Sequence, residues 1–410
     1  MAGEWAEMTL GEVVTLKRGY DLPAQDRQPG PHPVVSSSGI TGHHMEAKVK
    51  GPGVVTGRYG TLGEVHYIVE DFWPLNTTLY VEDFKGNDPR FISYLLQGLD
   101  FQAYSDKSSV PGLNRNHLHA EPVRVPLDIE EQYAIANVLG SIDDKIDLNQ
   151  RTNKALEAMA RAIFQAWFID FEPVKAKAAG AASFRGVPQD VFDQLPDQLT
   201  EGELGPIPAG WRVETLSGLV ELLGGGTPKR KVPQYWGGNI PWFSVRDAPA
   251  EGAMWVIDTE EHITQLGVDN SSAKVIRAGT TIISARGTVG RLALTAVPMA
   301  INQSCYGVQG ADGVGDFFVY FSLHYAVAEL QQRTHGSVFD TITRKTFDVL
   351  NRVRPQQQAL DAFEDAVLPC LQLARNNLFE NRTLALMRDA LLPQLISGKI
   401  RVPGTEGGGP

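Results

Sequence analysis

The sequence predicts an α/β (α+β) protein with an internal repeat: two homologous mixed domains, joined by two long helices that form an antiparallel coiled coil about a pseudo-two-fold axis. Three observations predict it. The same signals recur in the same order in residues 5–167 and 211–395, the loop GRYGTLG at 57–63 is matched by SARGTVG at 284–290, and each copy ends in a heptad repeat. A duplicated module on shared helices is suited to engage two copies of one partner, or one object of near two-fold symmetry.

Length and composition limit the class of protein. A chain of 410 residues is too long for one ordinary core, and its content of 42% hydrophobic and 21% charged residues fits a folded protein. No apolar run approaches the roughly 20 residues that span a bilayer, and the first residues lack a basic-then-apolar leader. Cys305 and Cys370 are too few for a disulfide framework or a structural zinc site. We expect a cytoplasmic protein without membrane contact.

The first mixed domain is expected over residues 1–128. Short β-rich runs at 53–56 and 78–81 are separated by Gly and Pro and predict strands. Apolar residues at helical spacing predict a helix over 90–104.

The second mixed domain is expected over residues 206–354 and repeats this plan. Its matching strand is predicted at 281–283 and its matching helix at 317–330. Between them, residues 301–302 are expected to correspond to residues 75–76 of the first copy.

Each mixed domain is followed by a predicted long helix, over 129–170 in the first copy and 355–400 in the second. Apolar residues alternate there in steps of four and three, a period that is typical of coiled coils. Two polar residues fall in each seam, with an offset of 228 between the copies: Asn149 and Asn153, and Asn377 and Asn381. An Asn in a seam fixes register, because its amide is satisfied only opposite a matching partner, so the pattern favours an antiparallel intramolecular pair. The alternative is two core helices of a globular domain.

Two further segments complete the predicted organisation. Residues 171–205 are Ala-rich and then polar, and we expect them to be a linker. Residues 401–410 are rich in Gly, and we expect a disordered tail.

The sequence contains no recognisable catalytic signature. Residues 397–399 (SGK) lack the upstream glycine of a P-loop, and the glycines at 224–226 are followed by Thr-Pro rather than by a cofactor fingerprint. The histidines at 43–44 and at 117 and 119 have no Cys or acidic set at metal-ligand spacing. We expect no catalytic, metal or cofactor site; an enzyme with a dispersed active site is the alternative.

Several loops are rich in groups that contact DNA. Those at 57–63 and 284–290 each follow a predicted strand and place Arg and Thr between glycines, so that a phosphate or a base edge can approach closely. Arg can bond a guanine edge through two hydrogen bonds. A tight turn with a surface Arg is the alternative, and the recurrence in both copies favours binding.

The second copy adds a basic stretch, GTPKRK at 226–231, beside aromatic residues at 235–242. This composition suits contact with a nucleic-acid backbone, although a solvated charge run beside core aromatics would look similar. Segments 107–116 and 335–345 offer further donors after the predicted domain helices. The candidate DNA-binding residues are Arg58, Tyr59, Thr61, Lys107, Ser109, Asn114, Arg115, Thr227, Lys229, Arg230, Lys231, Trp242, Ser244, Arg246, Ser284, Arg286, Thr288, Ser337 and Arg344.

The net charge of −11 neither supports nor excludes a nucleic-acid partner. Much of the surplus acid falls on the first long helix and the predicted linker, away from the candidate loops. Local patches decide binding, because attraction to phosphate is screened over about 10 Å.

Taken together, these residues make the chain resemble the DNA-specificity subunit of a type I restriction–modification system over roughly residues 1–400. The most telling motifs are LGPIPAGW at 204–211, GTP at 226–228, IPW at 240–242 and LLPQLISGKI at 391–400. The first copy departs from the pattern, because YDLP at 20–23 stands where a Gly-Thr-Pro is expected.

The resemblance implies two target-recognition domains, each reading one half of a bipartite, asymmetric DNA site, with the helices setting the unread spacer. It implies no catalysis and no cofactor in this chain, which would assemble with two adenine methyltransferase (modification) subunits and with restriction translocase subunits. The alternatives are the recognition subunit of another restriction or methylation architecture, and a coiled-coil scaffold that binds only protein.

Overall fold

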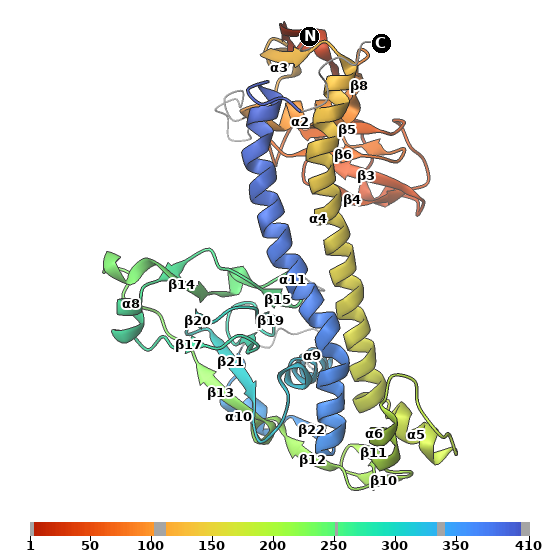
Figure 1. The fold of residues 1–410 in the computed structure, drawn as a ribbon, viewed down its shortest axis with the longest axis vertical. Coiled ribbons are helices and arrows are strands. Elements are labelled where there is room, and N and C mark those ends of the chain that lie inside the picture. The colour runs from red at the N-terminus through yellow and green to blue at the C-terminus, as the bar shows by residue number, and fades with distance from the viewer. Residues whose placement is uncertain (1–3, 102–111, 251–252, 334–340, 403–410) are drawn as a thin grey trace. The chain divides into compact units, whose positions relative to one another are not determined.

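The computed structural model describes residues 4–101, 112–250, 253–333 and 341–402. The chain forms two compact units, one of residues 1–147 with 382–410 (unit 1) and one of residues 148–381 (unit 2) (Figure 1). The long helices α4 (Ile129–Phe164) and α11 (Gln357–Ile396) each supply residues to both units.

The described residues of unit 1 form a mixed domain of small sheets and short helices. Its four-stranded sheet has the order β2-β8-β5-β6, a second sheet has the order β4-β3-β7, and β1 pairs with β9. The elements are β1 (Trp5–Thr9), α1 (Leu10–Val13), β2 (Thr15–Arg18), β3 (His32–Ser36), β4 (Gly39–His44), β5 (Gly53–Gly57), β6 (Val65–Ile68), β7 (Trp73–Pro74), β8 (Thr78–Asp83), α2 (Pro89–Gln97), α3 (Arg115–His119) and β9 (Pro122–Pro126).

The predicted helix of the first domain corresponds to α2, and its start is set by local chemistry. The Asp88 side chain accepts the Phe91 amide at 2.7 Å, and Pro89 occupies the first turn, where its missing N–H is not needed. The helix ends at Gln97, earlier than predicted, because Gly98 caps it and a glycine has low helix propensity. Part of the predicted extension, residues 102–104, lies outside the described residues.

Unit 2 repeats this architecture with larger sheets. The sheets have the orders β13-β21-β18-β19-β15 and β16-β14-β20-β17, and β12 pairs with β22 and β10 with β11. The elements are α5 (Glu172–Ala178), α6 (Gln189–Gln194), β10 (Leu199–Gly202), β11 (Gly205–Pro208), β12 (Arg212–Thr215), α7 (Leu216–Leu219), β13 (Val220–Gly224), β14 (Trp236–Phe243), β15 (Trp255–Val256), β16 (His262–Ile263), α8 (Gln265–Asp269), β17 (Val275–Ile276), β18 (Thr281–Ser284), β19 (Leu292–Thr295), β20 (Met299–Ile301), β21 (Cys305–Gly310), α9 (Asp316–Arg333), α10 (Arg344–Asp348) and β22 (Asn351–Arg354).

An aromatic cluster fastens the unit 2 domain to its long helices. Phe164 of α4 lies 5.5 Å from Phe318 of α9 and 5.7 Å from Phe363 of α11, measured between ring centroids. All three rings are at most 2% exposed. Burial of rings of this size contributes strongly to stability, so the domain and the helix ends form one core.

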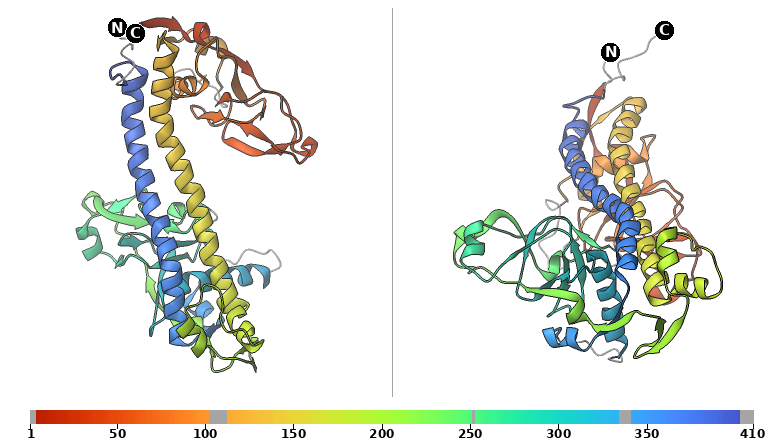
Figure 2. Two further views of the ribbon diagram at one scale, coloured as in Figure 1. Left: turned by 45° about the vertical axis from the view of Figure 1, so that its right-hand side comes forward. Right: turned by 60° about the horizontal axis from the view of Figure 1, so that its bottom comes forward.

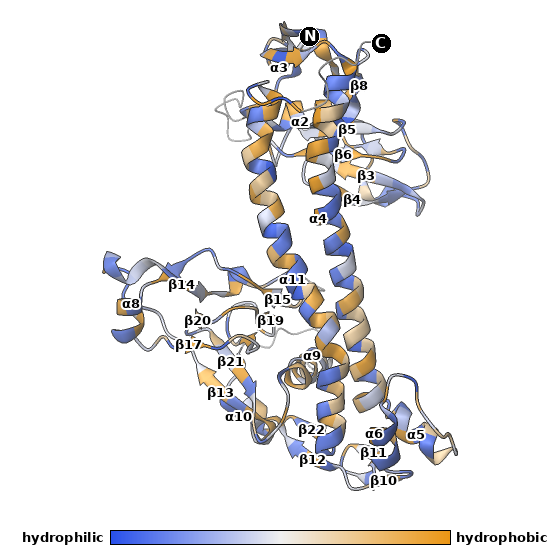
Figure 3. Ribbon diagram, in the orientation of Figure 1, coloured by the Kyte–Doolittle hydropathy of each residue, from blue (hydrophilic) through white to orange (hydrophobic). Residues whose placement is uncertain are grey.

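The long helices run antiparallel, as predicted. In unit 2, Asn149 donates to the Oδ1 of Asn381 at 2.8 Å, and Asn377 donates to the Oδ1 of Asn153 at 2.8 Å. Residue numbers increase along α4 while those of the partners decrease along α11, as they do in an antiparallel pair. Figures 1 and 2 show the helices side by side, and Figure 3 shows polar and apolar residues alternating along both.

The segment at 171–205, expected to be a linker, is folded. It forms α5, α6 and the hairpin β10–β11, and Val174, Phe192 and Leu195 are buried in the core of unit 2. The Ala-rich composition concealed these apolar residues, whose burial offsets the entropy of ordering the segment.

Among the described residues, no helix has the length and apolar content to cross a membrane.

Candidate nucleic-acid interface

Unit 2 contains a pocket of about 420 Å³ built by loops that follow β13, β14, β18 and β20. Each loop begins where its strand ends, so a rigid scaffold positions the loops' side chains. Six of the predicted DNA-binding residues meet here: Thr227, Arg230, Trp242, Ser244, Arg246 and Arg286. We call this the Arg286 pocket.

Arg230 forms one wall of the Arg286 pocket and is held from two sides. Its guanidinium lies over the rings of Trp236 and Trp242, 4.0 and 5.1 Å from the centroids, in cation–π geometry. It also forms a two-pronged ion pair with Glu261, one bond of which is 2.9 Å, and this pair lowers the pKa of the Glu261 carboxyl. Its charge is therefore partly balanced, and its position is fixed.

The ring of Trp242 is buried beneath the pocket and is not available to stack on a base. Its side chain is 3% exposed, and its indole N–H donates to the carbonyl of Gly226 at 2.9 Å. We therefore withdraw the predicted DNA contact of Trp242. The buried indole needs this partner, which explains why Trp242 and the GTP motif at 226–228 occur together.

Arg286 and Arg246 supply the accessible positive charge of the pocket. Arg246 is an exposed side chain whose nearest carboxylate, that of Glu260, lies 3.6 Å away. Arg286 is exposed, and none of the described residues forms an ion pair with it. A weakly paired guanidinium is free to bind a phosphate or a guanine edge.

The turn that presents Arg286 is shaped by Ser284. Its hydroxyl donates to the carbonyl of Thr288 at 2.5 Å and accepts the Arg291 amide at 2.8 Å. Ser284 is 1% exposed, so its predicted DNA contact is also withdrawn, and its role is to close the loop. Gly287, with φ +78°, permits the left-handed turn. Thr288 remains exposed at the tip.

Two amide side chains in the pocket were missed by the sequence analysis. Asn302 and Gln303 follow β20, and Gln303 accepts a hydrogen bond from the Thr227 hydroxyl. Amides at such a position can bond an adenine edge. The match of residues 301–302 with 75–76 pointed to this strand end, but with the wrong register.

Backbone hydrogen bonds correct that register by one residue. The Leu75 amide donates to Val35 at 2.8 Å, and the Asn302 amide donates to Phe243 at 2.9 Å after the corresponding parallel strand pair. Leu75 therefore corresponds to Asn302, and Asn76 to Gln303.

The same comparison shows that the YDLP segment of unit 1 is equivalent in the repeat to the GTP motif of unit 2. The Tyr20 amide bonds Pro74 at 2.8 Å as the Gly226 amide bonds Ile301 at 2.9 Å. Asp21 therefore occupies the position of Thr227. Its carboxylate accepts a hydrogen bond from Asn76, as Gln303 accepts one from Thr227. The two units keep the geometry of this contact and change its chemistry from amide and hydroxyl to amide and carboxylate.

The two glycine-bounded loops correspond as their sequence match predicts. Gly57 pairs with Thr78 as Ser284 pairs with Cys305, so the next residues, Arg58 and Ala285, are equivalent. Their carbonyls accept the amides of Leu113 and Ile342, both at 2.9 Å. Tyr59, rather than Arg58, is thus the counterpart of Arg286. The guanidinium of Arg58 lies over the Tyr59 ring, 4.6 Å from its centroid.

The remaining predicted residues lie in neighbouring loops or at helix starts. Thr61, Lys229 and Lys231 are exposed, Asn114 caps α3, and Arg115 follows it at an exposed position. Arg344 begins α10, the counterpart of α3, and donates to the carbonyl of Leu222 at 3.2 Å. The last three candidates lie outside the described residues: Lys107, Ser109 and Ser337.

Comparison with known proteins identifies the family of this chain. Residues 2–158 and 208–353 match the family model of the type I restriction modification DNA specificity domain, and the chain belongs to that family. It is 25% identical over 358 residues to the HindI specificity subunit of Haemophilus influenzae, with 76% of this chain and 77% of that protein covered. It is 26% identical over 322 residues to the MjaIX specificity subunit of Methanocaldococcus jannaschii, with 76% and 69% covered.

A solved structure shares the fold over nearly the whole chain. The type I restriction–modification S subunit from M. genitalium superimposes with a TM-score of 0.60 at 15% identity, covering 96% of each chain. The predicted fold class and family resemblance are confirmed.

Proposed function

We propose that this chain is the DNA-reading subunit of a type I restriction–modification complex and that each of its two mixed domains reads one half of a bipartite, asymmetric site. The observation that carries the proposal is the Arg286 pocket, where two accessible guanidiniums and two amides converge on loops at strand ends. These groups can bond guanine and adenine edges, and the phosphates around them.

Asymmetric reading is supported by the different chemistry of the two units. Where unit 2 has Thr227 and Arg286, unit 1 has Asp21 and Tyr59 at the equivalent positions. A carboxylate disfavours contact with phosphate and can accept from a cytosine amino group, whereas a hydroxyl can bond either. Two readers on one fold with different side chains would select different half-sites.

The proposal extends to partners. The chain would assemble with two adenine methyltransferase subunits, whose two copies suit the internal repeat, and with restriction translocase subunits for cleavage. It would itself be non-catalytic and act in the cytoplasm. Purified chain incubated with duplex DNA and a labelled adenosyl donor tests the non-catalytic role: incorporation of label without a partner subunit would contradict it.

Selection from a random duplex library tests the DNA-reading role directly. The chain, purified with its methyltransferase partner, should enrich duplexes with two fixed half-sites separated by a constant unread spacer. Recovery of a single contiguous motif, or of no motif at low salt, would refute bipartite reading. Low salt is needed because phosphate contacts make the affinity strongly salt-dependent.

A further inference from the structure

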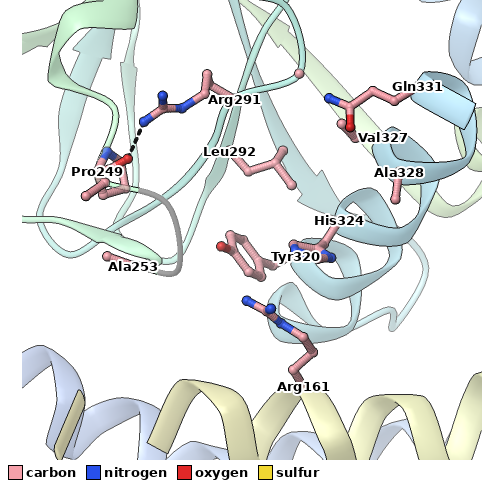
Figure 4. A pocket seen from close by; sticks show the side chains of 12 residues that line it. Arg161, Pro249, Ala253, Arg291, Leu292, Tyr320, His324, Val327, Ala328 and Gln331 are labelled. Atoms are coloured by element: carbon pink, nitrogen blue, oxygen red, sulfur yellow. Dashed lines mark hydrogen bonds between the residues drawn. The ribbon is translucent and has the colours of Figure 1, made fainter. Parts of the chain in front are cut away.

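A second pocket in unit 2, of about 400 Å³, shares no lining residue with the Arg286 pocket and is drawn in Figure 4. It is bounded by α4, by α9, and by residues 290–292 together with Pro249, Ala250 and Ala253. We call it the Arg161 pocket, after the one residue that the long helix α4 contributes.

Two guanidiniums from different elements border this pocket. Arg161 extends from α4 toward the pocket, and Arg291 lies across it (Figure 4). The buried Nε of Arg161 has no hydrogen-bond partner among the described residues. Arg291 donates to the carbonyls of Ala248 and Pro249 and forms no ion pair in the described part of the chain. An orphaned buried donor costs free energy unless a ligand satisfies it.

Helix α9 adds two neutral polar side chains. His324 is half-buried, burial and the nearby charge of Arg161 lower its pKa, and its Nδ1 has no partner among the described residues. Tyr320 is 5% exposed, and burial raises the pKa of its hydroxyl, which therefore stays a potential donor. The pocket is thus rich in donors.

The buried carboxylate nearest to Arg161 does not neutralise it. Glu157 lies one turn earlier on α4, and its side chain instead accepts the Met254 amide at 3.3 Å. No ion pair within 4.0 Å joins Glu157 and Arg161 among the described residues. The pocket therefore keeps its positive charge.

The equivalent pocket of unit 1 has a different charge pattern, because Arg388, which lines it, is ion-paired with Asp143 and Asp389. It has a volume of about 770 Å³ and is lined by the repeat counterparts Gly63, Val65 and Gln97 of Gly290, Leu292 and His324. The counterpart of Arg291 is Glu64, and that of Arg161, at the helix offset of 228, is Asp389. If the two arginines served only packing, the repeat would not carry acids at both positions.

We propose that the Arg161 pocket binds one oxyanion, a carboxylate or phosphate group presented by a small molecule or by a side chain of a partner protein. Two guanidinium groups with hydroxyl and imidazole donors form a recognition set for such an anion. The inference does not depend on DNA reading, because none of these residues lines the Arg286 pocket.

Duplex phosphates fit this pocket less well than a projecting group does. A duplex presents its phosphates on a convex surface and is contacted through exposed Lys and Arg, whereas Arg161 has a buried Nε and stands beside a buried tyrosine. A concave site suits a small ligand or a single side chain.

Nuclear magnetic resonance of the full chain, labelled with ¹⁵N in its histidine rings, tests the proposal with inorganic phosphate and acetate as probes. The His324 signal, assigned by its loss in His324→Gln, should move saturably with either probe at constant ionic strength. Arg161→Gln and Arg291→Gln should each weaken the apparent affinity about tenfold, the effect of one lost charge-assisted hydrogen bond. The exposed Arg185→Gln is the matched control and should leave the titration unchanged.

The source of the anion is distinguished in a second arm with the methyltransferase partner bound. Loss of the phosphate response in the complex would show that a partner side chain fills the pocket, and its retention would favour a small molecule. No movement of the His324 signal with either probe in the free chain would overturn the proposal, as would equal movement in Arg161→Gln. A shift produced by duplex DNA and abolished by Arg161→Gln would assign the pocket to the DNA backbone instead. Failure of DNA reading would leave these titrations unaffected, so the two proposals fail separately.

Discussion

The side-chain amide of Asn377 donates a 2.8 Å hydrogen bond to the Oδ1 of Asn153, 224 residues earlier in the chain. Asn153 in turn donates to the carbonyl of Ala374 at 3.0 Å. Both side chains are 7% exposed, so these bonds replace the water that the amides lose. The pair fixes one register of the two helices, because a shift would leave buried amide groups unpaired.

Replacing Asn377 with Ala should therefore lower the free energy of unfolding by about 1–3 kcal/mol, because the Oδ1 of Asn153 is left without its partner. Urea unfolding followed by circular dichroism measures this change. Lys154→Ala, at an exposed position of the partner helix α4, should change stability by less than about 0.5 kcal/mol. Equal effects of both substitutions would show that the seam is not energetically special.

Arg286→Ala should weaken binding by about 1–3 kcal/mol and relax only the half-site that unit 2 reads, because a base-edge contact would be lost in one reader. Arg58→Ala should affect only the other half-site. Competition binding with duplexes altered in one half at a time measures both. A single substitution that relaxed both half-sites would contradict independent readers.

Tyr59→Phe tests the functional equivalence of Tyr59 and Arg286. If Tyr59 is the functional counterpart of Arg286, removal of its hydroxyl should alter the preference at one base of the unit 1 half-site, by about 1 kcal/mol for a neutral hydrogen bond. The same competition assay reads the change. An unchanged preference would leave Arg58 as the reading residue of that loop.

The helix pair should act as a spacer whose length sets the distance between half-sites. Because Asn149 faces Asn381, inserts after Asp147 and after Asn381 face each other and leave both Asn pairs intact. Three heptads in each helix add about 31 Å, close to one turn of DNA at about 34–36 Å. The spacer recovered by library selection should lengthen by about nine or ten base pairs, with both half-sites unchanged.

A single-heptad insertion is the matched control. It adds about 10 Å, or roughly three base pairs, which rotates one half-site about a third of a turn around the duplex. Binding should therefore weaken more than with three heptads. A constant spacer in all active variants would show that the helices do not set the distance.

Glu157 should make the stability of the protein depend on pH. Burial raises the pKa of its carboxyl to about 7, although the Met254 amide and the charge of Arg161 lower it; Tyr320 of α9 is the other titratable group that interacts with it. Since the folded pKa lies above the ordinary carboxyl value of 4.5, the folded state holds this proton more tightly than the unfolded state does. The bound proton therefore stabilises the fold fully below about pH 4.5, and this contribution is lost as the pH rises to about 7.

Glu157→Gln removes this titration while keeping an acceptor for the Met254 amide. Relative to wild type, the variant should gain stability between pH 5 and 7, by at most about 1.4 kcal/mol per pH unit, and the difference should level off above pH 7.5. Urea unfolding at four pH values measures it. Glu364, whose pKa is also raised to about 7 by burial, is present in both proteins and cancels from the comparison. If the free energy of unfolding of the two proteins had the same pH dependence, the raised pKa could not belong to Glu157.

The repeat and the helix pair were predictable because their signals are periodic. Heptads specify a face of a helix wherever they occur, and Asn149 and Asn153 in a seam require amides opposite them. The aromatic and Gly-rich signals of the mixed domains placed β5, β18 and α9 within a few residues of their observed bounds.

The candidate site was only partly predictable, because long-range contacts decide which loop side chains remain accessible. Trp242 and Ser284 carry hydrogen-bond donors and lie in the predicted segments, yet each donates to a backbone carbonyl instead of facing solvent. Gln303 carries no motif, and only the folded strand end brings it beside Thr227. The repeat offset also changes along the chain, from 206 between α1 and α7 to 228 between the helices. The match of residues 75–76 with 301–302 was wrong by one residue for this reason.

The conserved contact between Asp21 and Asn76 in unit 1 and between Thr227 and Gln303 in unit 2 has an evolutionary consequence. Its side chains differ while the backbone hydrogen bonds that hold them stay the same. Under the proposed function, a mutation in one of these loops would thus change one half of the recognised site and leave the other half as it was. A population of cells could diversify its defence against foreign DNA by single-domain changes, without renewing the partner subunits.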